Sequence, residues 1–463
     1  MDQHPTTEEP NSENASVPNA QPVELQWWSI KSNVKLPEKV AELRRKLYQK
    51  AKQEPKFRFY TLYDRIYRLD VLTAAWLITL AKDKAPGIDG ITCTDIMHAP
   101  GGAPKFLEEL HQSLKTKTYR PDRVKRTYIL KPDGRKRPLG IPTIRDRIVQ
   151  TAATMILEAI FEADFLDTSY GFRPERSARQ ALQAIRGHLD DGYTEVYDAD
   201  LKGYFDTIPH DKLKLALQMR IADKAVLNLI EMWLKCEMVE TGEDGKTRIT
   251  RSQLGSPQGG VISPLLSNVY LHWFEYAFHR ETGPAHWAKA KIVRYADDFV
   301  ILARYQGAQL RGWIEQTLET RFKLTLNREK TTVVKLKDSG SSLDFLGYTF
   351  RYDKDLKGRD KRYLNIFPSR KAMATARDAI RDLTSPKRCF LPVVAMIAEI
   401  NQWQSGWTNY FGYGYPRVAF RAIHSYTVDK VTNHLRRRSQ RAYRPPVGKS
   451  FYAHVHDLGL RRP

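Results

Sequence analysis

Two apolar stretches that end in aspartates constrain the fold of this chain more than any other feature. The first, 195–200, reads Glu-Val-Tyr-Asp-Ala-Asp, and the second, 292–302, reads Ile-Val-Arg-Tyr-Ala-Asp-Asp-Phe-Val-Ile-Leu. The second predicts a hairpin with Asp297 and Asp298 at its tip, because β-prone residues flank the acids on both sides. Acids between buried strands are costly unless a cation or a partner compensates them. Pairing of the two strands would gather the acids; an ordinary surface turn is the alternative.

Converging carboxylates favour a magnesium site. Asp198 and Asp200 are two residues apart, so they share one face of a strand. Mg²⁺ prefers hard oxygen ligands, with substrate phosphates completing its coordination. Two such ions can activate an attacking hydroxyl and stabilise a leaving pyrophosphate. The two stretches lie far apart in the chain, so only the fold can unite them.

The charge of the chain is uneven. The formal net charge is +22, from 75 Lys and Arg against 53 Asp and Glu. Residues 360–463 hold 19 Lys and Arg against 6 Asp and Glu, a net charge of +13, whereas residues 1–30 hold five acids and no Lys or Arg. Aromatic residues are interleaved with the C-terminal cations. This mixture favours nucleic-acid binding, because cations neutralise phosphates and aromatic rings stack on unpaired bases; a solvated surface is the alternative.

Composition argues against several classes of protein. A hydrophobic content of 41% with 11% aromatic residues argues against a wholly disordered chain. No run of about 18 uncharged apolar residues predicts a membrane-spanning helix, and the first residues lack a signal-peptide pattern. Cys93, Cys236 and Cys389 are far apart, so a disulfide framework or a cysteine-based zinc site is not expected. We therefore expect a cytoplasmic protein, in the bacterial cytosol or nucleoid, without a membrane partner.

Two further segments suit phosphoryl transfer. Residues 131–138 read Lys-Pro-Asp-Gly-Arg-Lys-Arg-Pro, which places four cations at a predicted hairpin turn, where they can clamp a triphosphate. Residues 255–266 form a Gly- and Pro-rich loop that leads into an apolar helix. Its glycines permit close backbone approach, and Gln258 offers both a donor and an acceptor. A solvated turn and an ordinary helix entry are the alternatives, and the pattern of a P-loop is absent.

Eight blocks, in order, resemble the group II intron-encoded reverse transcriptase/maturase family. The resemblance covers roughly residues 60–460. The YADD and PQG motifs together resemble those of reverse transcriptases in particular. The blocks are 85–90 (APGIDG), 131–150 (KPDGRKRPLGIPTIRDRIVQ), 169–174 (SYGFRP), 200–208 (DLKGYFDTI), 257–259 (PQG), 295–298 (YADD), 327–331 (NREKT) and 345–348 (FLGY).

The resemblance implies an α+β fold: a right-hand polymerase, with fingers and an antiparallel palm sheet, followed by an α-helical thumb/maturase domain. Many family members carry a further DNA-binding and endonuclease domain with cysteine pairs. Because this chain lacks such pairs, we expect the endonuclease-lacking type. The expected parts are a disordered tail at 1–22, an N-terminal helical extension at 23–85, fingers and palm at 86–351, a thumb/maturase RNA-binding domain at 352–445 and a C-terminal basic tail at 446–463.

The resemblance also implies residue roles. Asp200, Asp297 and Asp298 are the expected catalytic carboxylates and ligands of two Mg²⁺ ions, with Mn²⁺ as a substitute; Asp198 and Asp206 are nearby acids without a ligand role. Phe205 matches the position that screens the sugar 2′ position. The expected nucleotide-binding residues are Lys131, Arg137, Phe205, Gln258 and Lys330. The expected nucleic-acid-binding residues are Phe345, Leu346, Gly347, Tyr348, Arg436, Arg437 and Arg438.

The segment 345–348 resembles the primer grip of the family. Core packing is the alternative for Phe205 and for this segment. In the segment 401–411 (NQWQSGWTNYF), we expect several of Trp403, Trp407 and Phe411 to belong to the core, because they recur every four residues on a helix. The arginines would then make most of the contacts with RNA.

The expected function is an RNA-directed DNA polymerase that adds dNTPs to a primer 3′-OH and binds group II intron RNA to promote splicing and retromobility. The expected partners are an RNA template, primer and cDNA, intron RNA, target DNA and dNTPs; a homodimer stays open. One alternative is a domesticated relative in DNA repair or defence. Another is an RNA-binding splicing cofactor without polymerase activity, against which the complete carboxylate set argues.

Overall fold

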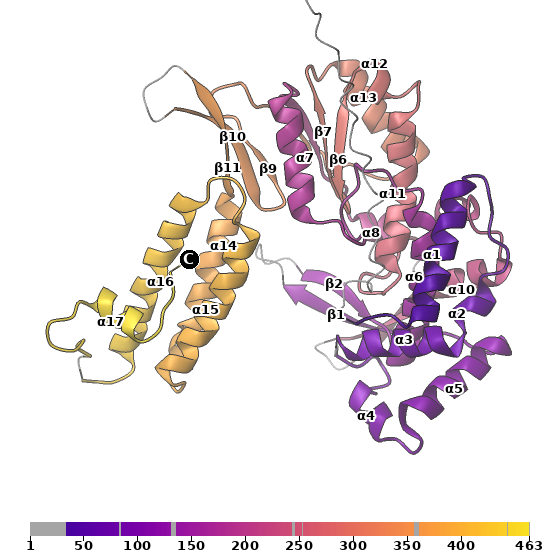
Figure 1. Cartoon of the computed structure of the whole chain (residues 1–463), viewed down its shortest axis with the longest axis horizontal. Helices are drawn as coiled ribbons and strands as arrows, with labels where there is room; N and C mark the ends of the chain where they lie inside the picture. Colours follow the sequence, from indigo (N-terminus) through magenta and orange to yellow (C-terminus); the bar gives the residue numbers. More distant parts are fainter. Residues whose placement is uncertain are drawn as a thin grey trace, which may run out of the picture.

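The protein combines helices with three β-sheets in the part of the chain that this computed structural model describes. That part comprises residues 34–82, 85–130, 136–242, 246–251, 253–355, 361–441 and 443–462, so the expected tail at 1–22 lies outside it. Helices α1–α6 (indigo to purple) and helices α14–α17 (orange to yellow) lie at opposite sides of the molecule in Figure 1. The mixed α and β content agrees with the prediction.

The N-terminal helices pack on one buried helix. Helix α6 (Ile144–Glu162) begins at Thr143, whose side chain accepts a hydrogen bond from the Asp146 amide, and almost all of its residues are buried. Helices α1 (Glu38–Gln53) and α3 (Leu69–Leu80) contact it. The buried apolar residues of α1 recur every three or four positions, as expected for a helix of the predicted N-terminal helical extension. Around them lie α2 (Tyr63–Ile66), α4 (Cys93–His98), α5 (Gly102–Lys115), α9 (His210–Gln218) and α10 (Lys224–Leu234).

The predicted basic hairpin is confirmed as two antiparallel strands. Strand β1 (Val124–Leu130) pairs with β2 (Lys136–Ile141), and it also runs parallel to β4 (Glu237–Thr241). Strand β5 (Thr247–Arg251) completes the sheet, whose order is β2-β1-β4-β5. This sheet therefore carries the basic hairpin towards the loop that precedes α11, where the Gly140 amide donates to the Gln258 carbonyl.

The central sheet has the order β6-β7-β3-β8. Its strands are β6 (Lys291–Tyr295), β7 (Asp298–Ala303), β3 (Glu195–Ala199) and β8 (Thr332–Lys335). Alternate residues face opposite sides, as strand geometry requires: Val293 and Val300 join a cluster with α7 (Ala178–Asp190), whereas Phe299 and Ile301 join the main core with α11 (Ser263–His279). Both faces are covered, which explains the nearly continuous apolar runs in the sequence.

Smaller helices complete this region. They are α8 (Tyr204–Thr207), α12 (Pro284–Trp287) and α13 (Ala308–Gln316). None of the helices in the described ranges is long and apolar enough to cross a membrane.

The C-terminal part consists of a three-stranded sheet and a helical group. Strands β9 (Leu343–Phe345), β10 (Tyr348–Lys354) and β11 (Arg362–Pro368) are antiparallel. Small apolar clusters join α14 (Arg370–Leu383), α15 (Val393–Tyr410), α16 (Arg417–Arg437) and α17 (Phe451–Asp457).

The prediction that several of Trp403, Trp407 and Phe411 belong to the core is confirmed for Phe411, while Trp403 and Trp407 are partly buried. Phe411 is buried, and Trp403 and Trp407 stack on each other with ring centroids 6.3 Å apart while packing against these apolar clusters.

Candidate active site

The predicted pairing of the two acidic stretches is confirmed. Strands β3 and β7 are antiparallel, with Ala199 opposite Phe299, so the end of β3 lies beside the start of β7. Asp200 follows β3, and Asp297 lies in the turn that joins β6 to β7. Ala296 has a left-handed backbone with φ of 60°, which an alanine rarely adopts. The sheet register and this turn bring the predicted carboxylates to one edge of the sheet.

The electrostatics of the carboxylates reflect this crowding. Desolvation and the negative charges of Asp297 and Asp200 raise the pKa of Asp298 to about 6. Burial, together with the charge of Asp200, raises the pKa of Asp297. Burial and the charges of Asp298 and Asp200 raise the pKa of Asp198 to about 7. Each charged form is therefore disfavoured by its neighbours, which is the situation that a nearby cation relieves.

Asp200 is held by the segment that follows α13. The Asn327 side-chain amide donates to the Asp200 carboxylate at 2.8 Å, and the Lys330 ammonium lies 3.3 Å from the same oxygen. The Asn327 backbone amide also donates to the Asp200 carbonyl at 2.8 Å. The structure thus places Lys330, an expected nucleotide-binding residue, beside Asp200. Asn327 opens one of the eight blocks, but the resemblance implies no role for it.

The chemistry of the carboxylates fits a hard divalent cation, because oxygen ligands with raised pKa values gain from a positive charge. As they stand, the described residues contain no group of three or more His, Cys, Asp or Glu side chains that could hold a metal ion. Asp200 faces Asn327 and Lys330 instead.

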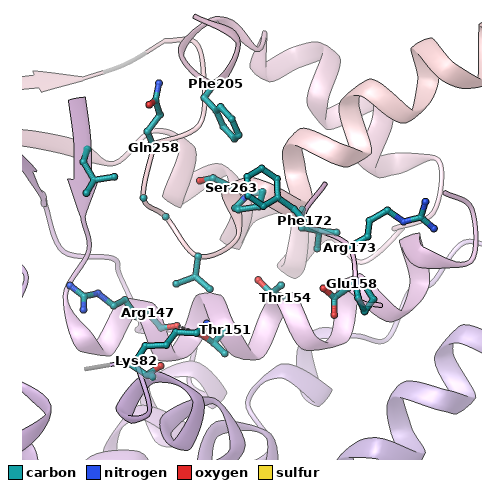
Figure 2. Close-up of a pocket in the computed structure, with 18 of the residues that line it drawn as sticks. Lys82, Arg147, Thr151, Thr154, Glu158, Phe172, Arg173, Phe205, Gln258 and Ser263 are labelled. Carbon is teal, nitrogen blue, oxygen red and sulfur yellow. Dashed lines mark hydrogen bonds between the residues drawn. The ribbon is translucent and has the colours of Figure 1, made fainter. Parts of the chain in front are cut away.

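A cavity of about 330 Å³ adjoins this region. Phe172, next to the Gly171 that packs on the turn, lines it, although Asp200, Asp297 and Asp298 do not. Figure 2 shows Phe205 and Gln258 on one side of it and Arg147 and Thr151 of α6 on the other. Arg137 of β2 also lines the cavity. Phe205 is 8% exposed and meets Phe172 edge to face, with ring centroids 6.5 Å apart. Phe205 therefore both packs against Phe172 and lines the cavity. Lys131, predicted as a second cation here, lies outside the described residues.

Gln258 connects two elements at the mouth of the cavity. Its side-chain oxygen accepts from the Arg137 guanidinium at 3.0 Å, and its side-chain nitrogen donates to the Asp206 carboxylate at 2.8 Å. Because Asp206 is only an acceptor and Arg137 only a donor, this pair fixes the orientation of the amide. The structure brings Arg137, Phe205 and Gln258 together. The sequence indicates Asp206 only by its position next to Phe205.

The segment 345–348 combines core residues with a tight turn. Phe345 and Tyr348 are buried, in agreement with the core-packing alternative. Leu346 and Gly347 form the turn between β9 and β10 with φ values of 49° and 81°. The Tyr410 hydroxyl donates to the Leu346 carbonyl at 2.9 Å. Helix α15 therefore fixes the backbone of this turn.

The three predicted RNA-binding arginines end helix α16. All three are exposed, but two have intramolecular contacts. The Arg436 guanidinium lies 4.6 Å from the centre of the Phe451 ring, and Arg437 donates to the Thr384 carbonyl at 2.9 Å. The structure places Arg436, Arg437 and Arg438 in the helical group and does not join them to the carboxylates.

Comparisons with known proteins agree with these features. The model of the reverse transcriptase (RNA-dependent DNA polymerase) family matches residues 129–350, and that of the group II intron maturase-specific domain matches residues 373–451. The first match contains the carboxylates and most of the cavity lining. The second covers most of α14–α17.

Two curated relatives are similar over much of the chain. Protein YkfC of Escherichia coli (strain K12) is 34% identical over 368 residues, which cover 72% of this chain and 93% of YkfC. The group II intron-encoded protein LtrA of Lactococcus lactis subsp. cremoris is 31% identical over 354 residues, which cover 63% of this chain and 57% of LtrA.

Among solved structures, telomerase from Candida albicans is similar at a TM-score of 0.39 with 11% identity, covering 72% of this chain and 62% of that one. That likeness is too distant to support a conclusion. The two family models and the extended identity to the curated relatives identify this chain as a reverse transcriptase that belongs to the group II intron-encoded reverse transcriptase/maturase family.

Proposed function

We propose that this reverse transcriptase extends a primer 3′-OH with dNTPs on an RNA template at the carboxylate edge of the central sheet. The observation that carries the proposal is the strand register that brings Asp200 near Asp297 and Asp298, and Arg137, Phe205 and Gln258 line a cavity close by. Carboxylates of this kind serve nucleotidyl transfer and have no use in simple RNA binding.

Asp200, Asp297 and Asp298 would hold two Mg²⁺ ions, with Mn²⁺ as the substitute. These ions, when bound, neutralise charge on the attacking primer oxygen and on the leaving pyrophosphate. Basic side chains of the protein supply the remaining positive charge. Arg137 binds the triphosphate by its planar guanidinium, together with Lys131, and Lys330 adds positive charge beside Asp200.

Phe205 selects the sugar in this proposal. Its ring lines the cavity directly beside the Gln258 loop, where a bulky side chain leaves no room for a ribose 2′-OH. Gln258 orients the nucleotide, while its own amide is fixed by Arg137 and Asp206. The 345–348 turn holds the primer strand through its backbone, because its two aromatic side chains are buried.

The proposed division of the chain keeps the expected bounds, although the boundary at 351 falls inside strand β10 and the tail contains helix α17. We assign the N-terminal helical extension to 23–85, fingers and palm to 86–351, the thumb and maturase RNA-binding domain to 352–445 and the basic tail to 446–463. Helices α1 and α3 of the extension share the core of α6, so the extension and the fingers are one packed unit.

The proposed partner of helices α14–α17 is group II intron RNA. Their exposed cations, including Arg436, Arg437 and Arg438, suit the phosphate backbone. Binding of intron RNA promotes its splicing, and reverse transcription at a target DNA site would complete retromobility. We place these steps in the bacterial cytosol.

Primer extension on an RNA template tests the polymerase proposal. With dNTPs and Mg²⁺, the purified protein is expected to make full-length cDNA, and chelation of divalent ions is expected to stop synthesis. A protein that binds the primer–template but adds no nucleotide would contradict the proposal.

The splicing part is tested separately, by the rate at which a precursor RNA with its group II intron splices with and without the protein. If the protein makes cDNA but does not accelerate splicing, its function is restricted to polymerisation.

A further inference from the structure

A buried arginine lies directly beneath the carboxylate turn. Arg294 belongs to β6 and is completely buried, as is its counter-ion Glu275 on α11. The Arg294 guanidinium lies 2.7 Å from the Glu275 carboxylate. An ion pair buried in this way stabilises a protein little, because desolvation offsets the attraction. Its presence under the turn therefore points to a geometric role.

The guanidinium of Arg294 contacts four separate groups. One of its terminal nitrogens donates to the Asn268 side chain at 2.8 Å and to the Ala296 carbonyl at 2.9 Å. The other donates to the Ser169 hydroxyl at 2.6 Å and to Glu275. Ala296 immediately precedes Asp297 and has the left-handed backbone of the turn. Because that backbone is unfavourable for alanine, it persists only where its surroundings hold it.

The same arginine ties a second segment to the turn. The Arg294 amide donates to the Thr168 carbonyl at 2.8 Å, and the Tyr170 amide donates to the Arg294 carbonyl at 2.9 Å. Gly171 then packs so closely on the turn that a Cβ at this position would lie 2.2 Å from the Ala296 nitrogen. This contact gives a physical reason for a glycine in the SYGFRP block. The SYGFRP and YADD blocks therefore form one rigid unit around Arg294.

We propose that Arg294 is a positioning residue for the Asp297 carboxylate, and that Glu275, Asn268 and Ser169 form the cage that orients its guanidinium. The inference rests on the proposed polymerase function. It adds that the placement of Asp297 depends on a planar, multiply bonded guanidinium. Positive charge alone is not sufficient.

Arg294→Lys tests this role, because lysine keeps the charge opposite Glu275 but lacks the planar fork. We expect kcat for primer extension to fall at least about tenfold, since small misplacements of reacting groups are costly. The KM for dNTP and the Kd for primer–template should stay within about twofold. Binding of Mn²⁺ alone, followed by electron paramagnetic resonance, should weaken in parallel, which gives a readout independent of catalysis.

Arg220→Lys is the matched control. Arg220 is also buried, lies 2.9 Å from Asp164 and donates to the Ala51 carbonyl, so its replacement likewise removes a buried planar fork. Thermal melts should show both variants destabilised, whereas only Arg294→Lys should lose kcat and Mn²⁺ affinity per folded molecule. Equal values in the two variants would overturn the inference.

Ser169→Ala decides the question if Arg294→Lys does not fold, because it removes a single bond to the guanidinium. The expected loss in kcat is about two- to fivefold, in line with one hydrogen bond, and unchanged kcat and Mn²⁺ binding would overturn the inference. If the unmodified protein makes no cDNA, the proposed function fails instead. The Mn²⁺ comparison then still reports on Arg294.

Discussion

Charged side chains are placed differently at two regions of the molecule, the turn between β6 and β7 and the end of helix α16. At the turn, carboxylates crowd one another, and a completely buried arginine donates to the Ala296 carbonyl while three side chains hold its guanidinium. At the end of α16, three arginines are exposed, and one lies over an aromatic ring. Chemistry requires charges at fixed positions, whereas a polyanion requires charges that it can reach. The two regions should therefore respond differently to substitution.

The largest expected effect is at Asp200. Asp200→Asn keeps the size of the side chain but removes the negative charge that faces Lys330. We expect primer extension to fall by about a thousandfold or more, because the charge neutralisation supplied by metal ions is worth several kcal/mol. Filter binding should show unchanged affinity for intron RNA. Activity within tenfold of the unmodified protein would remove Asp200 from the catalytic set.

Phe205→Ala should relax sugar selection. The ring lines the cavity next to Gln258, and its loss opens space for a 2′-OH. Single-nucleotide insertion is expected to show discrimination between dATP and ATP lowered by up to about a hundredfold, the range that pocket shape commonly supplies. Leu139→Ala, at another position that lines the cavity, is the control and should preserve discrimination. If both variants discriminate like the unmodified protein, Phe205 is a packing residue only.

The basic end of α16 should affect RNA affinity and leave chemistry intact. Replacement of Arg436, Arg437 and Arg438 by Gln is expected to weaken intron RNA binding by about tenfold and to reduce the dependence of log K on log salt concentration by two to three units, about 0.9 per phosphate contact. Replacement of three exposed cations of α1, Lys39, Arg45 and Lys46, changes the net charge equally and serves as the control. Equal losses in the two triple variants would indicate a general charge effect.

The smallest expected effect is on stability at Asp198. Its pKa of about 7 in the folded protein exceeds the ordinary value of 3.8. The stabilising contribution of the protonated group is therefore present below about pH 4 and is lost as the pH rises towards 7. Asp198→Asn imitates the protonated form, so without divalent ions it should raise the Tm at pH 8 by several degrees and change it little at pH 4. A Tm gain that is equal at both pH values would contradict this assignment.

The sequence predicts the carboxylate region well because its signals are local. The apolar run 292–302 with two acids at its centre predicts the β6–β7 hairpin, and the acid-ended run 195–200 predicts the neighbouring strand, which pairs as expected. The basic hairpin at 128–142 follows from its turn residues in the same way. These features depend on apolar runs of β-prone residues and on turn chemistry, which the order of residues records directly.

The supporting contacts could not be predicted from the sequence. Asn327 meets Asp200, Asp206 meets Gln258 and Arg294 meets Ser169 across long stretches of chain, and only the assembled fold decides these pairings. A buried arginine is also atypical, because arginine is usually exposed unless it is paired. For the same reason, the sequence could not show that Arg436 and Arg437 have intramolecular contacts.

The most direct test of the carboxylate edge as the active site measures cDNA synthesis and intron RNA binding in one preparation of Asp297→Ala. Asp297 lies in the turn that Arg294 supports and takes no part in the helical group of α14–α17. We predict cDNA synthesis below detection, with an intron RNA Kd and a Tm close to those of the unmodified protein. Retained cDNA synthesis would contradict the assignment of the carboxylate edge as the active site. Loss of RNA binding along with synthesis would contradict the separation of the two regions.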